Sequence, residues 1–258
     1  MVMMDSLFLF VVGIIVGFFG TVVGVGGGFI VVPFLTLVYH VSPQIAVGTS
    51  MCIVALNSIS GAVSYARQHR IDYRTGVIFS LAMFPGAFLG AYLLQKVSKP
   101  AFDIGFGIFL LCIAAYTVFK ENKKSKVDAV TPVEFVRPHF NILLGIAISF
   151  FIGFYASMAG VGGGLIHVPA MIYLFNFHPY FAIPTSIFIL SISSTFAVGS
   201  HMMVGAIEWS FVPFLGAGAI VGAQIGGRLS KRIKSKWLIR VLVVAIVIAA
   251  VRLITRYL

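Results

Sequence analysis

One glycine-rich motif occurs twice in the sequence and gives its clearest chemical signal. Residues 24–33 read GVGGGFIVVP and residues 160–169 read GVGGGLIHVP, each between long apolar runs. Three adjacent glycines each cost a helix about 1 kcal/mol relative to alanine, so we expect the helix to break there. A new helix that starts after the break directs free N–H groups and the positive end of its dipole inward, which suits a small anion. Paired breaks at matching places in two halves indicate the substrate site of a transporter.

The predicted substrate-binding residues are the glycines of the two motifs and the polar side chains nearest to them. They are Gly26, Gly27, Gly28, Thr49, Ser50, Asn57, Gly162, Gly163, Gly164, His167, Thr185, Ser186 and Ser193. The alternative for a glycine is close helix packing, which we expect instead at Gly86, Gly90, Gly222 and Gly226. Leucine at Gly27 or Gly163 is expected to abolish substrate binding and to leave the protein folded, because it would fill the space that an oxyanion needs.

Each polar candidate also has a structural alternative. Serine and threonine in membrane helices often bond to a carbonyl of their own helix, although the matched Thr-Ser pairs favour substrate contact. Asn57 could join two helices or donate its amide to an oxyanion. His167 is an ionisable group inside an apolar segment, which makes it a functional candidate. His201 and Arg67 are expected near the membrane surface, at the ends of corresponding long helices.

Nothing in the sequence predicts catalysis. The motif lacks the Gly-Lys-Ser/Thr end of a phosphate-binding loop, and no catalytic triad or metal cluster fits. No carboxylate lies in the middle of an apolar segment, which argues against the usual buried proton relay. Cys52 and Cys112 lie in apolar runs at unmatched positions, so we expect helix packing rather than a disulfide or metal site. The sequence therefore predicts no enzyme, no metal and no cofactor.

The composition indicates a membrane protein. Of the 258 residues, 60% are hydrophobic and 10% are charged, whereas soluble domains carry about 25% charged residues. Apolar stretches recur along the whole chain, and the first of them reads as a transmembrane helix rather than a cleaved signal. The net charge of +11 comes from basic residues in short loops, as the positive-inside rule expects. Nucleic-acid binding is therefore excluded as a function.

The second half of the chain repeats the first without a gap, in the register that aligns Gly160 with Gly24. In this repeat register, Thr185-Ser186 matches Thr49-Ser50, Ser193 matches Asn57 and Glu208 matches Asp72. Matching polar residues, glycines and prolines indicate duplication, because chance similarity would match only the aliphatic residues. We divide the chain into a first membrane repeat (1–119), a polar cytoplasmic linker (120–139) and a second membrane repeat (140–258).

The loop charges predict that the two repeats insert in opposite directions. The loop 67–74 carries three arginines, whereas its counterpart 203–210 carries no lysine or arginine. If 67–74, 120–139 and 228–236 are cytoplasmic, each half crosses the membrane an odd number of times. The predicted fold is an all-α polytopic membrane protein with two inverted-topology repeats of about five helical segments each. The second segment of each repeat, 28–39 or 164–177, is short and could dip into the membrane and return as a hairpin.

The motifs resemble those of the TauE/SafE family of membrane permeases, also called the sulfite exporter or toluene-sulfonate uptake family. The likeness lies in GxxxGxGGGxxxVP at 20–33, AGVGGGxxxVPA at 159–170, the Gly48-Thr49-Ser50 run, the Asn57-Ser58-x-Ser-Gly61 run and the small residues at 86–91. It covers nearly the whole chain and implies transport of sulfite, sulfonates, sulfoacetate or similar anions. His167 departs from it, because an apolar residue is more usual there, and Pro184 stands where the first half has Gly48.

These observations favour a secondary transporter of a small sulfur-containing anion that works by alternating access between the two repeats. An anion channel or facilitator is the alternative, because the same helix ends could line a continuous pore. A membrane scaffold or receptor would leave two costly helix breaks without a role. The expected partners are the small anionic substrate and the lipid bilayer of the plasma (inner) membrane. A coupling ion or proton, the direction of transport and a homo-oligomer stay open.

Overall fold

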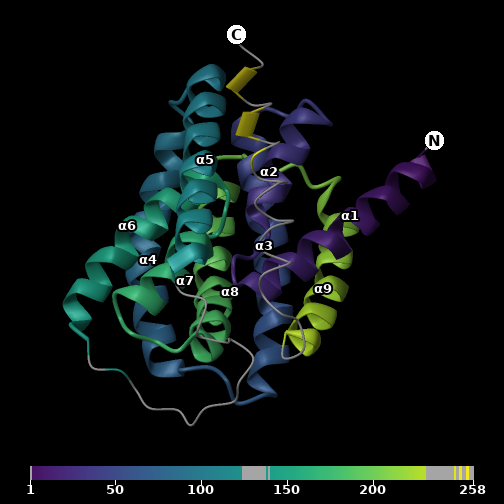
Figure 1. Ribbon diagram of the computed structural model, residues 1–258. Coiled ribbons are helices and arrows are strands. Elements are labelled where there is room, and N and C mark those ends of the chain that lie inside the picture. The colour runs from purple at the N-terminus through teal and green to yellow at the C-terminus, as the bar shows by residue number, and fades with distance from the viewer. Residues whose placement is uncertain are drawn as a thin grey trace.

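The computed structural model describes residues 2–123, 138, 140–230 and five positions between 247 and 255. Within this part of the chain there are nine α-helices and no strand (Figure 1). They are α1 (Val2–Val23), α2 (Gly28–Leu37), α3 (Pro43–Ala66), α4 (Tyr73–Leu94), α5 (Lys99–Lys123), α6 (Ile142–Ala159), α7 (Gly164–Tyr173), α8 (Pro179–Met203) and α9 (Val212–Leu229). Apart from the end of α5, the predicted linker 120–139 and the last predicted apolar segment lie almost entirely outside the described residues.

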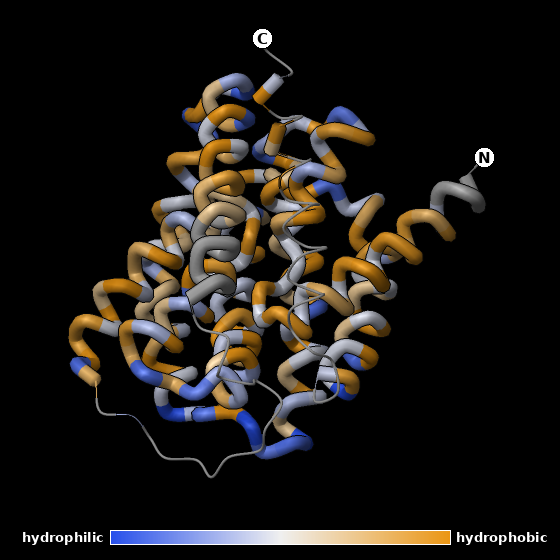
Figure 2. Tube along the Cα trace, viewed as in Figure 1, coloured by the Kyte–Doolittle hydropathy of each residue, from blue (hydrophilic) through white to orange (hydrophobic). Residues whose placement is uncertain are grey.

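Six of these helices, α1, α3, α4, α6, α8 and α9, are long and apolar enough to cross a membrane. Apolar residues dominate the helices, and hydrophilic residues gather at the turns at the two ends of the molecule (Figure 2). This arrangement confirms the prediction of an all-helical, multi-pass membrane protein.

The helices α2 and α7 have 10 residues each. At 1.5 Å per residue each is about 15 Å long, about half the thickness of a bilayer core. Both end a few residues earlier than the predicted segments 28–39 and 164–177. His40 (φ 54°) and Asn176 (φ 56°) adopt the left-handed conformation just beyond the two helices, which is incompatible with helix continuation. Neither short helix can cross the membrane alone.

The two short helices start near the middle of the molecule. Figure 1 shows α1 and α6 approaching this region from opposite sides. Helix α1 ends just before α2, and α6 ends just before α7, so that each pair joins at one of the glycine motifs. The predicted breaks therefore lie at the centre of the bundle.

The main helix contacts join the two halves of the chain, and they come in equivalent pairs. The helices α3 and α8 pack together, α9 packs on α3, and α4 packs on α8. On the flanks, α1 pairs with α9 as α6 pairs with α4. In the repeat register, α1 corresponds to α6 and α4 to α9, so these two flanking pairs are equivalent. Their correspondence supports the predicted duplication, whereas the inverted topology stays a prediction.

Glycines let the flanking pairs approach closely. A Cβ atom at Gly86 would meet the carbonyl oxygen of Phe150, and one at Gly222 would meet that of Ile14. Gly90 likewise faces the backbone of α6, and Gly226 faces the backbone of α1. The packing role predicted for these four glycines is confirmed. Their neighbours are backbone atoms, which cannot move aside as a flexible side chain can.

Candidate functional site

Both predicted helix breaks are present, and glycines form them because the backbone turns through left-handed conformations. The φ angles are 83° at Gly26 and 88° at Gly27, and 79° at Gly162 and 76° at Gly163. Side chains other than glycine rarely adopt such angles. Gly27 and Gly163 then act as N-caps of α2 and α7 without a side-chain cap. Each short helix therefore begins with backbone N–H groups that no side chain satisfies.

The two breaks differ in their internal hydrogen bonds. In the first break, Gly26 N–H donates to the Gly20 carbonyl at 3.0 Å. In the second, Val161 N–H donates to the Ala156 carbonyl at 3.2 Å, but among the described residues the Gly162 N–H has no counterpart of the Gly26 bond. The backbone N–H of Gly162, a buried residue, is therefore available to donate a hydrogen bond to a ligand.

Each of the two long central helices is tied by a serine to the break of the opposite half. Ser50 Oγ on α3 donates to the carbonyl of Gly160 at 2.8 Å. Ser186 Oγ on α8 donates to the carbonyl of Gly24 at 3.1 Å. These two bonds are equivalent in the repeat register, and each links one half of the chain to the other. Both serines are fully buried, and their hydroxyl protons are used within the protein.

The remaining motif residues make similar contacts. Gly28 lies against the carbonyl oxygen of Gly160, and Gly164 lies against that of Gly24, too close for a side chain at either position. Thr49 Oγ1 accepts a hydrogen bond from Glu208 N–H at 2.9 Å, and Thr185 Oγ1 accepts one from Asp72 N–H at 3.0 Å. The two threonines thereby fasten loops of the opposite half.

Asn57 fills the space beside the first break. Its Nδ2 donates to the Gly26 carbonyl at 2.9 Å, and its Oδ1 accepts a hydrogen bond from Thr21 Oγ1 at 3.0 Å. The side chain is completely buried. It acts as a tie between α1, the first break and α3.

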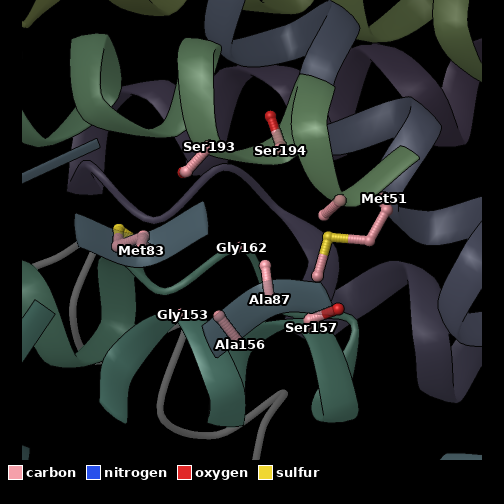
Figure 3. Close-up of a pocket in the computed structure, with 10 residues that line it drawn as sticks. Met51, Met83, Ala87, Gly153, Ala156, Ser157, Gly162, Ser193 and Ser194 are labelled. Carbon is pink, nitrogen blue, oxygen red and sulfur yellow. The ribbon is translucent and has the colours of Figure 1, made fainter. Parts of the chain in front are cut away.

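A cavity lies at the equivalent place beside the second break. It is lined by Met51, Met83, Ala87, Gly153, Ala156, Ser157, Gly162, Ser193, Ser194 and Ala197. Figure 3 shows the two serines of α8 across from Gly153, Ala156 and Ser157 of α6. The empty space measures about 190 Å³ with its open side included, but the part that water can occupy holds about one water molecule at most. No charged side chain lines it.

The cavity exists because two side chains are shorter in the second half. Ser193 occupies the position of Asn57, and Ser157 occupies the position of Thr21. Ser193 makes no hydrogen bond to another described residue, so it forms no tie to Gly162 like that from Asn57 to Gly26. Of the predicted site residues, the structure thus places Gly162 and Ser193 together on one cavity. Ser157 also lines it and was missed by the sequence analysis.

His167 lies away from this cavity. It is 1% exposed, its ring is 5.4 Å from that of Phe79, and neither ring nitrogen has a hydrogen-bond partner among the described residues. Its counterpart in the first half is Val31, which is buried in an apolar cluster. The equivalent position of the first half thus holds an apolar side chain.

His201, expected near the membrane surface at the end of its helix, is completely buried within the protein. The loop after α8 turns back over it, with Ala206 N–H bonded to the His201 carbonyl at 3.0 Å. Its Nε2 lies 3.2 Å from both the hydroxyl and the carbonyl oxygen of Ser157. Its Nδ1 has no partner among the described residues. His201 therefore stands directly behind a residue that lines the cavity.

The expected effect of leucine at the breaks also needs correction. A Cβ at Gly27 would lie 2.9 Å from the Val16 carbonyl oxygen, and a Cβ at Gly163 would lie 2.9 Å from Met83 Cε. Both positions pack against neighbouring helices, and both have positive φ. We therefore expect leucine there to cost folding stability before it tests binding.

Other candidate chemistry is not supported by the described residues. The part of the chain that the structure describes holds no group of three or more histidine, cysteine, aspartate or glutamate side chains that could bind a metal ion. Cys52 is buried, Cys112 is exposed, and both are free thiols.

Comparison with known proteins agrees with this architecture. A family model described as Sulfite exporter TauE/SafE matches residues 9–253. The chain is 32% identical to the probable membrane transporter protein YunE of Bacillus subtilis, over 97% of this chain and 98% of the relative. It is 29% identical to the probable membrane transporter protein ORF9 of Sinorhizobium sp, over 84% of this chain and 80% of the relative. No solved structure matches. The protein therefore belongs to the TauE/SafE family and is a membrane transporter.

Proposed function

We propose that this transporter is a secondary carrier of a small sulfur-containing anion, which binds in the cavity beside the second break. The observation that carries the proposal is the buried cavity lined by Gly162, Ser157 and Ser193. Sulfite, a sulfonate or sulfoacetate would suit it, and the family description, sulfite exporter, supports this chemical class.

Hydrogen-bond donors rather than a fixed charge would hold the anion. The hydroxyls of Ser157 and Ser193 and the N–H of Gly162 can each donate to an oxygen atom. The N-terminus of α7 adds the positive end of a helix dipole, which favours an anion by about 0.3–1 kcal/mol or more when buried. Met51 and Met83 form an apolar wall that suits the carbon or sulfur part of an organosulfur anion. The arrangement thus fits a polar head joined to a small apolar body.

The small free volume supports a carrier with alternating access. A cavity with room for about one water must widen before an oxyanion can enter, so anion binding requires a change of conformation. The reciprocal ties from Ser50 and Ser186 suit two inverted repeats that exchange conformations around the site. An anion channel is the alternative. Saturable uptake that accelerates with substrate on the opposite side would favour the carrier, and conductance far above carrier rates would favour the channel.

Uptake of labelled sulfite and small sulfonates into proteoliposomes tests the proposal together with Ser193→Asn. This substitution copies Asn57 into the second half, where the amide could donate to the Gly162 carbonyl and accept from Ser157. We expect uptake to fall to background while the unfolding temperature in detergent is kept or raised, because the cavity is filled and a buried carbonyl gains a partner.

The matched control is Ser191→Asn, two residues earlier on α8 and outside the cavity lining, which should keep uptake. Normal uptake by the Ser193→Asn protein would show that the anion binds elsewhere. If the unmodified protein neither binds nor moves any sulfur oxyanion, the proposed substrate class is wrong.

A further inference from the structure

We propose that His201, acting through Ser157, is a proton-binding site coupled to the anion cavity, so that the transporter binds one proton with each anion. This inference rests on the proposed function, since it assigns a coupling proton to the same cavity. His201 itself does not line the cavity; it is a positioning residue that acts on the anion through the Ser157 hydroxyl.

The hydrogen bonds of the ring define which nitrogen can take the proton. Nε2 lies 3.2 Å from the Ser157 carbonyl oxygen, which can only accept. The neutral imidazole must therefore carry its hydrogen on Nε2 to make this bond. Nδ1 is then a bare acceptor, and it has no partner among the described residues. It is the atom that would gain the proton.

The same geometry frees the Ser157 hydroxyl for the cavity. Nε2–H can donate to Ser157 Oγ, also at 3.2 Å, so Oγ acts as the acceptor in that contact. The hydroxyl hydrogen of Ser157 then remains available to an anion, since Ser157 lines the cavity. A positive charge on His201 would strengthen the donor chain from Nε2 through Ser157 to the anion.

The first half of the chain has the same contact without a group suited to this role. In the repeat register, His201 corresponds to Tyr65 and Ser157 to Thr21. The Tyr65 hydroxyl donates to the Thr21 carbonyl at 3.0 Å, as Nε2 of His201 does to Ser157. In the first half, where Asn57 fills the space, this contact is made by the phenol of Tyr65. In the second half, which has the cavity, it is made by the imidazole of His201. The imidazole is the side chain that commonly changes charge near neutral pH.

No other charge competes for this position. The ionisable side chains on the elements around His201 are Cys52 and Tyr65 on α3, Tyr73, Arg74 and Tyr92 on α4, Tyr155 on α6, Tyr180 on α8 and Glu208 in the loop after α8. Among the described residues the side-chain hydrogen bonds of the ring go to Ser157, and none joins it to one of these groups. Tyr92, Tyr155 and Glu208 are exposed. An anion in the cavity would thus be the nearest partner for a charged His201.

Coupling follows from the cost of isolated charges in this place. A buried imidazolium without a counter-ion is costly, and so is an anion among apolar residues without a positive partner. Each reduces the cost of the other, and this effect must be reciprocal. The loaded site would carry no net charge from a monovalent anion and one proton, which lowers the cost of moving both through the membrane.

The test measures anion affinity as a function of pH in detergent, with methanesulfonate and sulfite as probes. Methanesulfonate stays ionised throughout, so pH acts on the protein alone. For the unmodified protein we expect the Kd to fall by about tenfold per pH unit on acidification over the range in which one proton is taken up. His201→Gln keeps a donor to Ser157 without titrating, and His201→Tyr copies Tyr65. Both should show a methanesulfonate Kd that varies by less than about twofold.

Proteoliposomes supply the second measurement. A proton gradient directed into the liposomes, with the acidic side outside, should drive methanesulfonate accumulation by the unmodified protein but not by either variant. Tyr65→Phe is the matched control and should keep the pH dependence, and thermal unfolding shows that each variant is folded. Variants that retain the pH dependence of the unmodified protein, or folded variants that bind at no pH, would overturn this inference. So would an unmodified protein that binds methanesulfonate independently of pH. Absence of binding to both probes would instead overturn the proposed function, and this inference with it.

Discussion

Asn57 and Ser193 occupy equivalent positions, and the size of the side chain decides whether space remains beside each break. The sequence predicts that both are substrate contacts because both are polar and follow a Thr-Ser pair. The structure uses the amide of Asn57 internally, through Gly26 and Thr21. Ser193 is too short for the same tie. A sequence alone does not tell which polar group has a partner within the protein, because Gly26 lies 31 positions from Asn57 and meets it only in the fold.

His167 is a lone buried histidine, and a substitution can decide whether its role is functional or structural. Its ring lies against Phe79 with both nitrogens unpartnered among the described residues, and its counterpart is Val31. Because an unsatisfied buried polar group costs about 1–3 kcal/mol, we expect His167→Val to keep or raise the unfolding temperature and to keep anion uptake.

Thermal unfolding in detergent and uptake in proteoliposomes measure the two quantities for His167→Val. Val31→Ala is a control for the sensitivity of the unfolding assay, because it removes buried methyl groups from the equivalent position and should lower the temperature. A stable His167→Val protein that no longer binds the anion would assign His167 to the substrate site.

At the level of helices, the breaks and the two short helices could be predicted because their causes are local. Consecutive glycines, a short apolar run and the dipeptide Ser42-Pro43, which suits the start of the next helix, all lie within about 20 residues of one another. The contacts of the central helices could not be predicted in this way. Ser50 and Gly160 are 110 positions apart, and their bond depends on how α3 crosses the second break. The burial of His201 likewise depends on the loop that folds over the end of α8.

The serine ties between helices and breaks should contribute measurably to stability. Ser50→Ala and Ser186→Ala each remove the donor of a buried carbonyl, that of Gly160 or Gly24. We expect each change to lower the free energy of unfolding by about 1–3 kcal/mol. Chemical unfolding in detergent is the measurement.

Ser191→Ala is the matched control for these ties, since its hydroxyl bonds to Phe188 within its own helix. We expect its effect to stay within about 0.5 kcal/mol. If the Ser50→Ala and Ser186→Ala proteins are as stable as the Ser191→Ala protein, these hydrogen bonds do not stabilise the breaks.

Across the whole molecule, the contacts of one half recur in the other with the partners exchanged. Ser58 and Ser194 are equivalent to each other, and their hydroxyl oxygens lie 3.4 Å apart where α3 meets α8. Under the proposed exchange of conformations between the repeats, a distance between two equivalent residues is the same in both end states. This contact should therefore move least during transport.

A cross-link between these two helices tests that expectation. In a protein with Cys52 and Cys112 replaced by alanine, the Ser58→Cys, Ser194→Cys pair is close enough for a disulfide or a mercury bridge. We expect the cross-linked protein to keep at least about half of the uptake of the reduced protein in the same liposomes. Because Ser194 also lines the cavity, anion binding is measured beside uptake. A cross-linked protein that binds the anion but takes it up only after reduction would contradict the proposed exchange of conformations.

The hydrogen bonds of the Asn57 amide also bear on the number of anions that one chain carries in each transport cycle. A duplicated chain with two identical halves would present two equivalent cavities, and two anions could share one transport cycle. Here the tie from Asn57 to Gly26 occupies the first position, and the cavity is found beside the second break. Each chain should then carry one anion per cycle, and uptake should rise hyperbolically with anion concentration, with a Hill coefficient of about 1.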